Sequence, residues 1–526
     1  MLMLVPFFLL FTLTISTEVT LKPWKYRFDS DGNLLDAHDG KLYYFEEKYY
    51  LYGTAYNCGF RWRTANFTSP FCGFKSYSST NMKVWKDEGF LFNANTTEWQ
   101  GRCAYEAACF RPKVLQNPKT KEYIMWMNEG AAEYSYTTFT SSHPTGPFVE
   151  KAQPVMAYAR GSESYGNGDF GITIGPNGTG YIVYDTTPVV STHGYLEISN
   201  ITFGIVQELS DDYTSTKPNW MITGNVNNIE AWDMFYRGGW WYLTFGHICG
   251  YCTATDTSYI KSKSPWGPWL EENRVRLTNT SCGGQNTMAS QIPTNANSSG
   301  LQDTWIIGSD LWTGDVNEGK AGLHWEPLRF LPNGDIEPIS CNAQEYHTDI
   351  PVSESPVKDV VEDAAVHSTT GDFNWNCGFG IQAKSILFQF FQATKTGNVT
   401  EFGVNVAQQA NNADMSMSLI QVTSNIGDLY TTQGRTDSLW GGTYPVANIG
   451  WSFPMVKGQP NVTVTEGTWY GIQLSSRAAS IPYCYLERNT SAETGGTRSF
   501  MAEQQQGRYP LTPIPGKEMR FYLQIE

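Results

Sequence analysis

The chain has 526 residues, which is long enough for more than one hydrophobic core, and its 49 glycines, 26 prolines and 14% aromatic residues are typical of many short strands joined by turns. Its formal net charge of −15 and pI near 5.0 argue against nucleic acid or another polyanion as a partner. No segment after the N-terminus is apolar over a membrane-spanning length, so the sequence predicts neither a membrane protein nor a membrane partner.

The N-terminus, MLMLVPFFLLFTLTIST, is an apolar run followed at once by polar sequence. It is too short to span a bilayer comfortably, and it predicts a secretory signal peptide over residues 1–17, cleaved between Ser16 and Glu18. Acceptor motifs for N-glycosylation follow along the whole chain, at Asn66, Asn95, Asn177, Asn200, Asn279, Asn297, Asn398, Asn461 and Asn489. Together these features predict a secreted, extracellular glycoprotein, which we expect to be a monomer.

The ten cysteines fit an oxidising compartment, in which they should be paired. Three pairs are close in sequence, Cys58 with Cys72, Cys103 with Cys109, and Cys249 with Cys252, and they predict local disulfides on loops. The spacing of Cys249 and Cys252 would also suit half of a zinc site, but the sequence offers no second half. We therefore interpret this pair as a disulfide.

One short aromatic strand recurs five times: YYLYG, EYIMW, GYIVY, WYLTF and TWIIG. Aligned on Tyr50, Tyr123, Tyr181, Tyr242 and Trp305, the copies are 73, 58, 61 and 63 residues apart, and turns precede several of them, as for the second strand of a hairpin. The repeat predicts an all-β fold with a five-bladed β-propeller over residues 21–340. A β-sandwich with coincidental spacing is the alternative, but it does not explain the closing strings SSHPTGPF and KSPWGPW in two of the units.

The sequence changes character after the last repeat. Residues 341–372 are polar and rich in Pro and Ser, which predicts a linker. Residues 373–526 contain alternating segments such as SILFQFFQAT and MSMSLIQVTS, which predict a β-sandwich of the jelly-roll type with a separate core. Cys377 and Cys484 are available to crosslink it.

Three acidic residues occupy matching places in the repeat. Asp39 lies eleven residues before Tyr50, while Asp169 and Glu230 lie twelve residues before Tyr181 and Tyr242. Each alone would be interpreted as a turn residue or a strand-edge charge. In a propeller, however, the innermost strands line one funnel, where neighbouring carboxyl groups take different pKa values. One could then donate a proton while another stays ionised as a base.

The strings DGKLYYFEEKYYLYGT, DFGITIGPNGTGYIVY and EAWDMFYRGGWWYLTFG together resemble glycoside hydrolase family 43. The resemblance implies an inverting glycosidase in which Asp39 is the general base, Glu230 the general acid, and Asp169 orients Glu230 and tunes its pKa. AHDG, FRPKV, Gln285 and GSDLW are most similar to the branch with exo-β-1,3-galactanases. That branch often lacks the first Asp, so the resemblance leaves the substrate open among arabinose-, xylose- and galactose-containing polysaccharides or oligosaccharides.

The chain also departs from the family pattern. Gly40 follows Asp39 where a proline is common, and GGQNTMASQ stands where many members place a histidine near the axis. We therefore expect no cofactor and no catalytic metal, although a structural Ca2+ ion in the propeller axis stays open.

A carbohydrate substrate calls for flat apolar platforms and a few fixed polar contacts. The candidate substrate-binding residues are His38, Tyr56, Trp62, Trp232, Gln285, Asp310 and Trp312. An ordinary packing role is the alternative for the aromatic residues and for His38. At the level of function, the alternatives to a glycosidase are a non-hydrolytic glycan-binding propeller and a structural adhesion protein. The matched acids favour the enzyme.

Overall fold

The computed structural model of the chain describes the residues outside a set of short ranges. Those ranges are 1–14, 24–25, 61–68, 104–108, 130–135, 158–164, 188, 193–194, 199–202, 294–303, 315–317, 343–344, 353–357, 369–371, 380–384, 409–412, 477–481, 491–498 and 506–508. Most of the predicted signal peptide, the candidate Trp62 and the acceptor sites Asn66, Asn200 and Asn297 lie outside the described residues.

Five antiparallel sheets follow one another along the first two thirds of the chain. The first is β2 (His38–Phe45), β3 (Lys48–Thr54), β4 (Phe74–Ser79) and β5 (Lys86–Phe90), and the second is β6 (Cys109–Gln116), β7 (Tyr123–Glu129), β8 (Tyr136–Ser141) and β9 (Val149–Ala152). The third is β10 (Tyr165–Ile174), β11 (Gly180–Thr187), β14 (Phe203–Leu209) and β15 (Thr216–Asn227). The fourth is β16 (Ile229–Arg237), β17 (Trp240–His247), β18 (Thr257–Ser262) and β19 (Val275–Thr278), and the fifth is β20 (Gln285–Ile292), β21 (Thr304–Leu311) and β22 (Gly322–Pro327).

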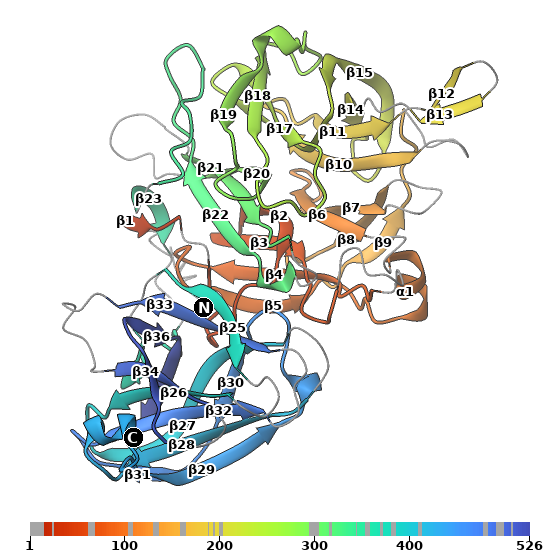
Figure 1. Ribbon diagram of the computed structural model, residues 1–526. Helices are drawn as coiled ribbons and strands as arrows, with labels where there is room; N and C mark the ends of the chain where they lie inside the picture. Colours follow the sequence, from red (N-terminus) through yellow and green to blue (C-terminus); the bar gives the residue numbers. More distant parts are fainter. Residues whose placement is uncertain are drawn as a thin grey trace, which may run out of the picture.

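The five sheets form a closed ring, which we call the ring body (Figure 1). The first strand of each sheet packs against the first strand of the next, and β20 packs against β2. An apolar cluster fills each of the five gaps between neighbouring sheets; in the gap between the third and fourth sheets, for example, Val183 and Val206 pack with Trp232 and Trp241. The five repeated aromatic segments lie on β3, β7, β11, β17 and β21, each the second strand of its hairpin as predicted.

Small elements decorate the ring body. They are the helix α1 (Thr97–Cys103), the hairpin β12 (Val189–Thr192) and β13 (Tyr195–Ile198), and the short 3-10 turns η1 (Glu271–Asn273) and η2 (Glu318–Lys320). Within the described ranges, no helix is long and apolar enough to cross a membrane. The all-β prediction is therefore confirmed, apart from this one short helix.

The predicted linker, residues 341–372, contains two strands. β23 (Tyr346–Val352) pairs along its whole length with β1 (Ile15–Leu21), and β24 (Val366–His367) pairs with the last strand of the chain. Tyr346, Thr348 and Ile350, at every second position of β23, are buried, so one face of the strand is packed. The prolines and serines around this short pattern concealed it.

Two larger sheets make up the C-terminal part, the C-terminal body (Figure 1). The first has β24, β37 (Phe521–Ile525), β27 (Gly397–Ala407), β33 (Tyr483–Asn489) and β25 (Asn374–Phe379) in order, with β30 (Met455–Gly458), β31 (Val462–Val464) and β36 (Lys517–Met519) paired beside them. The second has β29 (Thr436–Tyr444), β28 (Met415–Val422), β32 (Trp469–Ser476), β26 (Ser385–Gln392), β34 (Ser499–Gln505) and β35 (Thr512–Ile514). The turns η3 (Ile426–Tyr430) and η4 (Val446–Asn448) complete it.

Five disulfides crosslink the chain. They are Cys58–Cys72, Cys103–Cys109, Cys249–Cys252, Cys282–Cys341 and Cys377–Cys484. The structure thus contains the three predicted local pairs and the predicted C-terminal pair, and it adds Cys282–Cys341. Cys249 and Cys252 form a disulfide rather than half of a metal site.

The two bodies share an apolar cluster, so the C-terminal core is not fully separate. In this cluster Tyr26 and Leu34 of the N-terminal segment pack with Phe373, Phe453 and Leu486. Arg520 reinforces the boundary, because its Nη1 donates to the carbonyl oxygen of Gly32 at 2.7 Å and its guanidinium stacks over the ring of Phe28 at 3.5 Å.

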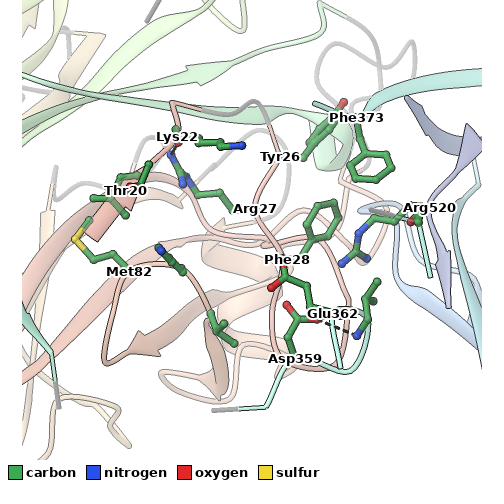
Figure 2. Close-up of a pocket in the computed structure, with 15 residues that line it drawn as sticks. Thr20, Lys22, Tyr26, Arg27, Phe28, Met82, Asp359, Glu362, Phe373 and Arg520 are labelled. Carbon is green, nitrogen blue, oxygen red and sulfur yellow. Dashed lines mark hydrogen bonds between the residues drawn. The ribbon is translucent and has the colours of Figure 1, made fainter. Parts of the chain in front are cut away.

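A cavity of about 300 Å³ also lies at this boundary (Figure 2). Tyr26, Arg27 and Phe28 line it from one body, and Phe373 and Arg520 from the other. None of the predicted site residues within the described ranges lines it. Its walls are therefore part of the contact between the two bodies and not of the predicted active site.

Arg520→Ala tests how strongly this contact stabilises the chain. Arg520→Ala loses two charge-assisted hydrogen bonds, to the Gly32 carbonyl and to Asn405 Oδ1, and leaves this buried Oδ1 without its Arg520 donor. Such a loss costs about 2–4 kcal/mol, so we expect the free energy of unfolding to fall by that amount. Arg520→Lys should recover part of it, since lysine keeps the charge but not the planar fork. Urea titrations of both variants measure the effect, with the exposed Lys48→Ala as control. An Arg520→Ala protein as stable as the wild type would contradict this prediction.

Candidate active site

All five first strands break register at the same end of the ring body. The breaks lie between His38 and Lys41 in β2, and at the corresponding places of β6, β10, β16 and β20. Inside three of these breaks, Asp39, Arg111 and Ala231 have φ values of 54°, 56° and 59°. Such left-handed conformations are uncommon for residues other than glycine, and a bulge of this kind re-aims the side chain beside it. The backbone is thus locally strained where the predicted acids lie.

Gly40 belongs to one of these breaks and explains the departure from proline at this position. A Cβ atom at Gly40 would lie 1.5 Å from the carbonyl oxygen of Tyr52. The close approach of β2 and β3 therefore requires glycine directly after Asp39.

The bulged ends surround a cavity of about 130 Å³. Its lining residues are Asp39, Phe110, Arg111, Asp169, Glu230, Cys249, Gly250, Tyr251, Gln285 and Trp312. Each of the five first strands contributes at least one of these side chains. The structure therefore brings Asp39, Asp169 and Glu230 together at one cavity, as the register of the repeat predicts.

The surroundings of Glu230 favour its protonated form. Burial raises its pKa to about 8, and the nearby charge of Asp169 contributes. Its Oε1 atom accepts hydrogen bonds from the backbone N–H of Cys249 at 2.6 Å and from Gln285 Nε2 at 2.5 Å. These donors hold the side chain in place, so Glu230 is a fixed carboxylic acid with a proton to give.

Asp169 forms an ion pair with Arg111, whose Nε lies 2.6 Å from its Oδ1. Its Oδ2 accepts a hydrogen bond at 3.0 Å from the backbone N–H of Ala231, the residue after Glu230. Asp169 thus contacts the strand that carries Glu230 and also raises the pKa of Glu230 by its charge. Asp185 stands behind this group, and burial together with the charges of Asp169 and Glu230 raises its pKa well above the usual range.

Asp39 is the third carboxyl group at the cavity. Burial raises its pKa to about 6, against the lowering effect of the Arg111 charge. Tyr56 donates its O–H to Asp39 Oδ2 at 3.1 Å, and the backbone N–H of Asp39 donates to Asp310 Oδ2 at 2.6 Å. At pH 7 Asp39 is mostly ionised while Glu230 is mostly protonated. The cavity thus holds a proton acceptor and a proton donor at the same pH.

Comparison with known proteins identifies the family. The family model described as glycosyl hydrolases family 43 matches residues 34–298, half of the chain and most of the ring body. The chain belongs to glycoside hydrolase family 43. The prediction of a glycoside hydrolase is confirmed at this level.

Solved structures of other glycosidases resemble this family 43 chain at low identity. An exo-β-1,3-galactanase from Clostridium thermocellum is 16% identical with a TM-score of 0.47, over 96% of this chain and 100% of that one. An exo-β-1,3-galactanase from Phanerochaete chrysosporium, solved with galactose, is 15% identical with a TM-score of 0.46, over 89% and 100%. A putative exo-β-1,3-galactanase from Bifidobacterium bifidum is 18% identical with a TM-score of 0.45, over 60% and 95%. No curated protein matches the chain.

Two of the predicted substrate-binding residues line the cavity of this family 43 protein, namely Gln285 and Trp312. They contact each other, since Trp312 Nε1 donates to Gln285 Oε1 at 3.1 Å. Both therefore lie at the same cavity as the three carboxyl groups.

Three other candidates lie behind the cavity wall. His38 is fully buried, its ring stacks on Tyr56 at 5.3 Å, and its Nδ1 lies 3.3 Å from Asp310 Oδ1. Burial lowers the pKa of His38, but the hydrogen bond to Asp310 and the charges of Asp310, Asp36 and Asp39 together raise it by more. His38, Tyr56 and Asp310 therefore hold Asp39 from behind and do not line the cavity, which corrects their predicted role.

Trp232 is a core residue, so its prediction as a sugar platform is wrong. Its side chain is fully buried, packs on Phe245 with ring centroids 5.0 Å apart, and leaves no room for a Cβ at Gly204. Trp232 lies two residues after Glu230, so a regular strand would point both to the same face, but the register break between Glu230 and Asp233 turns Trp232 into the core.

The sequence reasoning missed Arg111 and Tyr251, which line the cavity. Arg111 lies twelve residues before Tyr123, the same offset that Asp169 and Glu230 have in their own units. The position twelve residues before the aligned aromatic residue therefore carries a charged side chain in this unit too, but the sequence prediction considered only acids. Tyr251 lies on a loop outside the repeat, and no pattern in the sequence singled it out.

Buried lysines occupy the axis of the ring body below the cavity. Lys113 Nζ donates to the carbonyl oxygens of Asp39, Gly40 and Thr287 at 3.1, 2.9 and 3.0 Å, and burial lowers its pKa to about 7. A Ca2+ ion would use carbonyl oxygens of this kind. Because Lys113 Nζ already donates to these three oxygens, the residues do not fit a Ca2+ ion at this position.

Arg111→Gln should move the pH profile of the enzyme. The Arg111 charge lowers the pKa values of both Asp39 and Glu230, so its removal should raise both and shift both limbs of the kcat/KM profile to higher pH, by about 1 unit. Arg111→Lys keeps the charge and serves as the matched control. Initial rates between pH 4 and 10 measure the shift. If the Gln variant were active with both limbs unmoved, Arg111 would not set these pKa values.

Proposed function

We propose that this family 43 protein is a secreted, inverting glycosidase that hydrolyses O-glycosidic bonds in arabinose-, xylose- or galactose-containing polysaccharides or oligosaccharides. Glu230 is the general acid, Asp39 is the general base, and Asp169 orients Glu230 and keeps its pKa high. Gln285 and Trp312 contact the sugar. The proposal rests above all on one observation: the buried carboxyl groups of Glu230 and Asp39 line the same cavity, where burial raises the pKa of Glu230 to about 8 and that of Asp39 only to about 6.

The reaction takes one displacement. Glu230 gives its proton to the glycosidic oxygen as the bond to the anomeric carbon breaks. Asp39 removes a proton from a water molecule, and the oxygen of that water attacks the anomeric carbon from the opposite face. The sugar leaves with inverted configuration, Asp39 is protonated and Glu230 is ionised, and proton exchange with solvent restores both groups.

The remaining parts of the proposal concern architecture and setting. We interpret the five sheets as the blades of a five-bladed propeller and the C-terminal body as a jelly-roll-like sandwich, supported by the closed ring of first strands and by the two large sheets. The five disulfides support an oxidising, extracellular setting. The proposed reaction uses only protein side chains and water, on a monomer.

A substrate panel tests the proposal. The full-length protein is incubated at pH 7 with aryl arabinosides, xylosides and galactosides and with plant polysaccharides, including β-1,3-galactan, and the released sugars are identified. We expect release of one sugar type at a rate that falls on both sides of pH 6–8. Absence of release across the panel, from protein shown to be folded, would overturn the proposed substrate classes.

A further inference from the structure

A small disulfide-closed loop forms one wall of the cavity. Cys249 and Cys252 are bonded to each other, and Cys249, Gly250 and Tyr251 line the cavity. Tyr251 has a φ of 52°, a left-handed conformation that a tyrosine seldom adopts. A crosslink across so few residues restricts the other conformations of the loop, so it stabilises this unfavourable one.

One end of the loop holds Glu230. The N–H of Cys249 donates to Glu230 Oε1 at 2.6 Å, and the carbonyl oxygen of Cys249 accepts from Gln285 Nε2 at 3.2 Å. Gln285 Nε2 donates to the same Oε1 at 2.5 Å. Because Oε1 accepts two N–H groups, the acidic proton of Glu230 lies on Oε2. The loop therefore determines which oxygen carries the proton.

The middle of the loop reaches the other carboxyl group. The hydroxyl oxygens of Tyr251 and Tyr56 are 2.9 Å apart, and Tyr56 gives its own proton to Asp39 Oδ2. Tyr251 must therefore be the donor to Tyr56. This chain of two O–H groups favours the ionised form of Asp39, because a donor that is itself hydrogen-bonded is a stronger donor.

We propose that the Cys249–Cys252 loop is a positioning element that holds both carboxyl groups of the reaction, Glu230 through the backbone of Cys249 and Asp39 through Tyr251 and Tyr56. This inference rests on the proposed roles of Glu230 and Asp39. The loop residues are positioning residues because they act through the two carboxyl groups. The disulfide then supports activity as well as the folded state.

The two contacts predict separate effects on the pH profile. Five groups face Glu230: Asp169, Arg111, Asp185, Gln285 and the N–H of Cys249. The groups that face Asp39 are Arg111, Asp310, His38 and Tyr56, and Tyr251 acts on it through Tyr56. The Cys249 N–H lowers the pKa of Glu230, so its loss should move the alkaline limb to higher pH. Loss of the Tyr251 hydroxyl should raise the pKa of Asp39 and move only the acid limb.

The first test removes the crosslink with the double variant Cys249→Ser, Cys252→Ser. We expect a folded protein whose kcat falls by about 10²-fold, the usual cost of misplacing a reacting group by 1 Å, and whose alkaline limb lies at higher pH. The double variant Cys377→Ser, Cys484→Ser loses a disulfide in the C-terminal body and should keep the wild-type pH profile. Thermal melts confirm that each variant is folded. A loop variant with the wild-type kcat and pH profile would overturn the inference.

Tyr251→Phe is the second test and leaves the disulfide in place. We expect the acid limb of kcat/KM to move to higher pH while the alkaline limb stays. An unchanged acid limb would overturn the link to Asp39. Failure of the inference is distinct from failure of the proposed function: if Glu230→Gln and Asp39→Asn were as active as the wild type, the catalytic roles would be wrong whatever the loop variants do.

Discussion

Glu230→Gln should lose nearly all activity on natural polysaccharide and keep much of its activity on aryl glycosides with good leaving groups. In a polysaccharide the leaving group is a hydroxyl oxygen of the next sugar, which leaves poorly unless it is protonated as the bond breaks. General acid catalysis of this step contributes roughly 10²–10⁴-fold to the rate. A nitrophenolate leaves without a proton, so the missing acid costs little. The amide can still accept from the Cys249 N–H, so the site should keep its geometry.

Rates on a series of aryl glycosides of graded leaving-group pKa measure this effect. The variant should depend far more steeply on leaving-group pKa than the wild type, and its alkaline limb near pH 8 should vanish, because the group that produced it is gone. Glu272→Gln makes the same chemical change on an exposed 3-10 turn and should behave as the wild type. Equal losses on good and poor leaving groups would show that Glu230 acts in some way other than as an acid.

The positions of the three acids were predictable because the repeat fixes them. The recurring strand is the second strand of its sheet, and an offset of eleven or twelve residues from it reaches the cavity end of the first strand. The closed ring then brings Asp39, Asp169 and Glu230 to one cavity although they are far apart in sequence. The order of the strands can be predicted from the spacing of the turns and the periodicity of the apolar residues, and both can be read from a single sequence.

The direction in which each side chain points at the cavity end of the first strands was not predictable. A regular strand alternates its faces, but every first strand has a break in register next to the cavity, and one extra residue reverses the faces beyond it. For this reason Trp232 lies in the core, although its sequence neighbourhood resembles that of a sugar platform. Tyr56 and His38 were likewise near the site but on the far side of Asp39.

The boundary between the two bodies was hidden for a related reason. Tyr26 and Leu34 are ordinary apolar residues near the start of the chain, and their partners in the cluster lie more than three hundred residues away, and Phe453 more than four hundred. No local sequence pattern predicts a contact between residues so far apart in the chain. The polar composition of residues 341–372 indicated an exposed connection, while the pairing of β23 with β1 depends on a strand from the opposite end of the chain.

Asp39→Asn should depress hydrolysis of good and poor substrates alike, by roughly 10²-fold or more, because a water molecule must be deprotonated whatever group leaves. Asparagine has nearly the same shape as aspartate, and its amide oxygen can still accept from Tyr56, so loss of activity would not reflect loss of folding. The acid limb near pH 6 should disappear with the carboxyl group.

NMR of the first-formed sugar completes this test on the wild-type enzyme, because the proposed single displacement requires the anomeric configuration to invert. Asp372→Asn, an exposed site in the C-terminal body, is the matched control and should keep full activity. A fully active Asp39→Asn protein would leave Asp39 as a strained bulge residue without a part in the chemistry. Retained configuration would instead require a covalent sugar intermediate on one of the cavity carboxylates, and water would then attack in a second step.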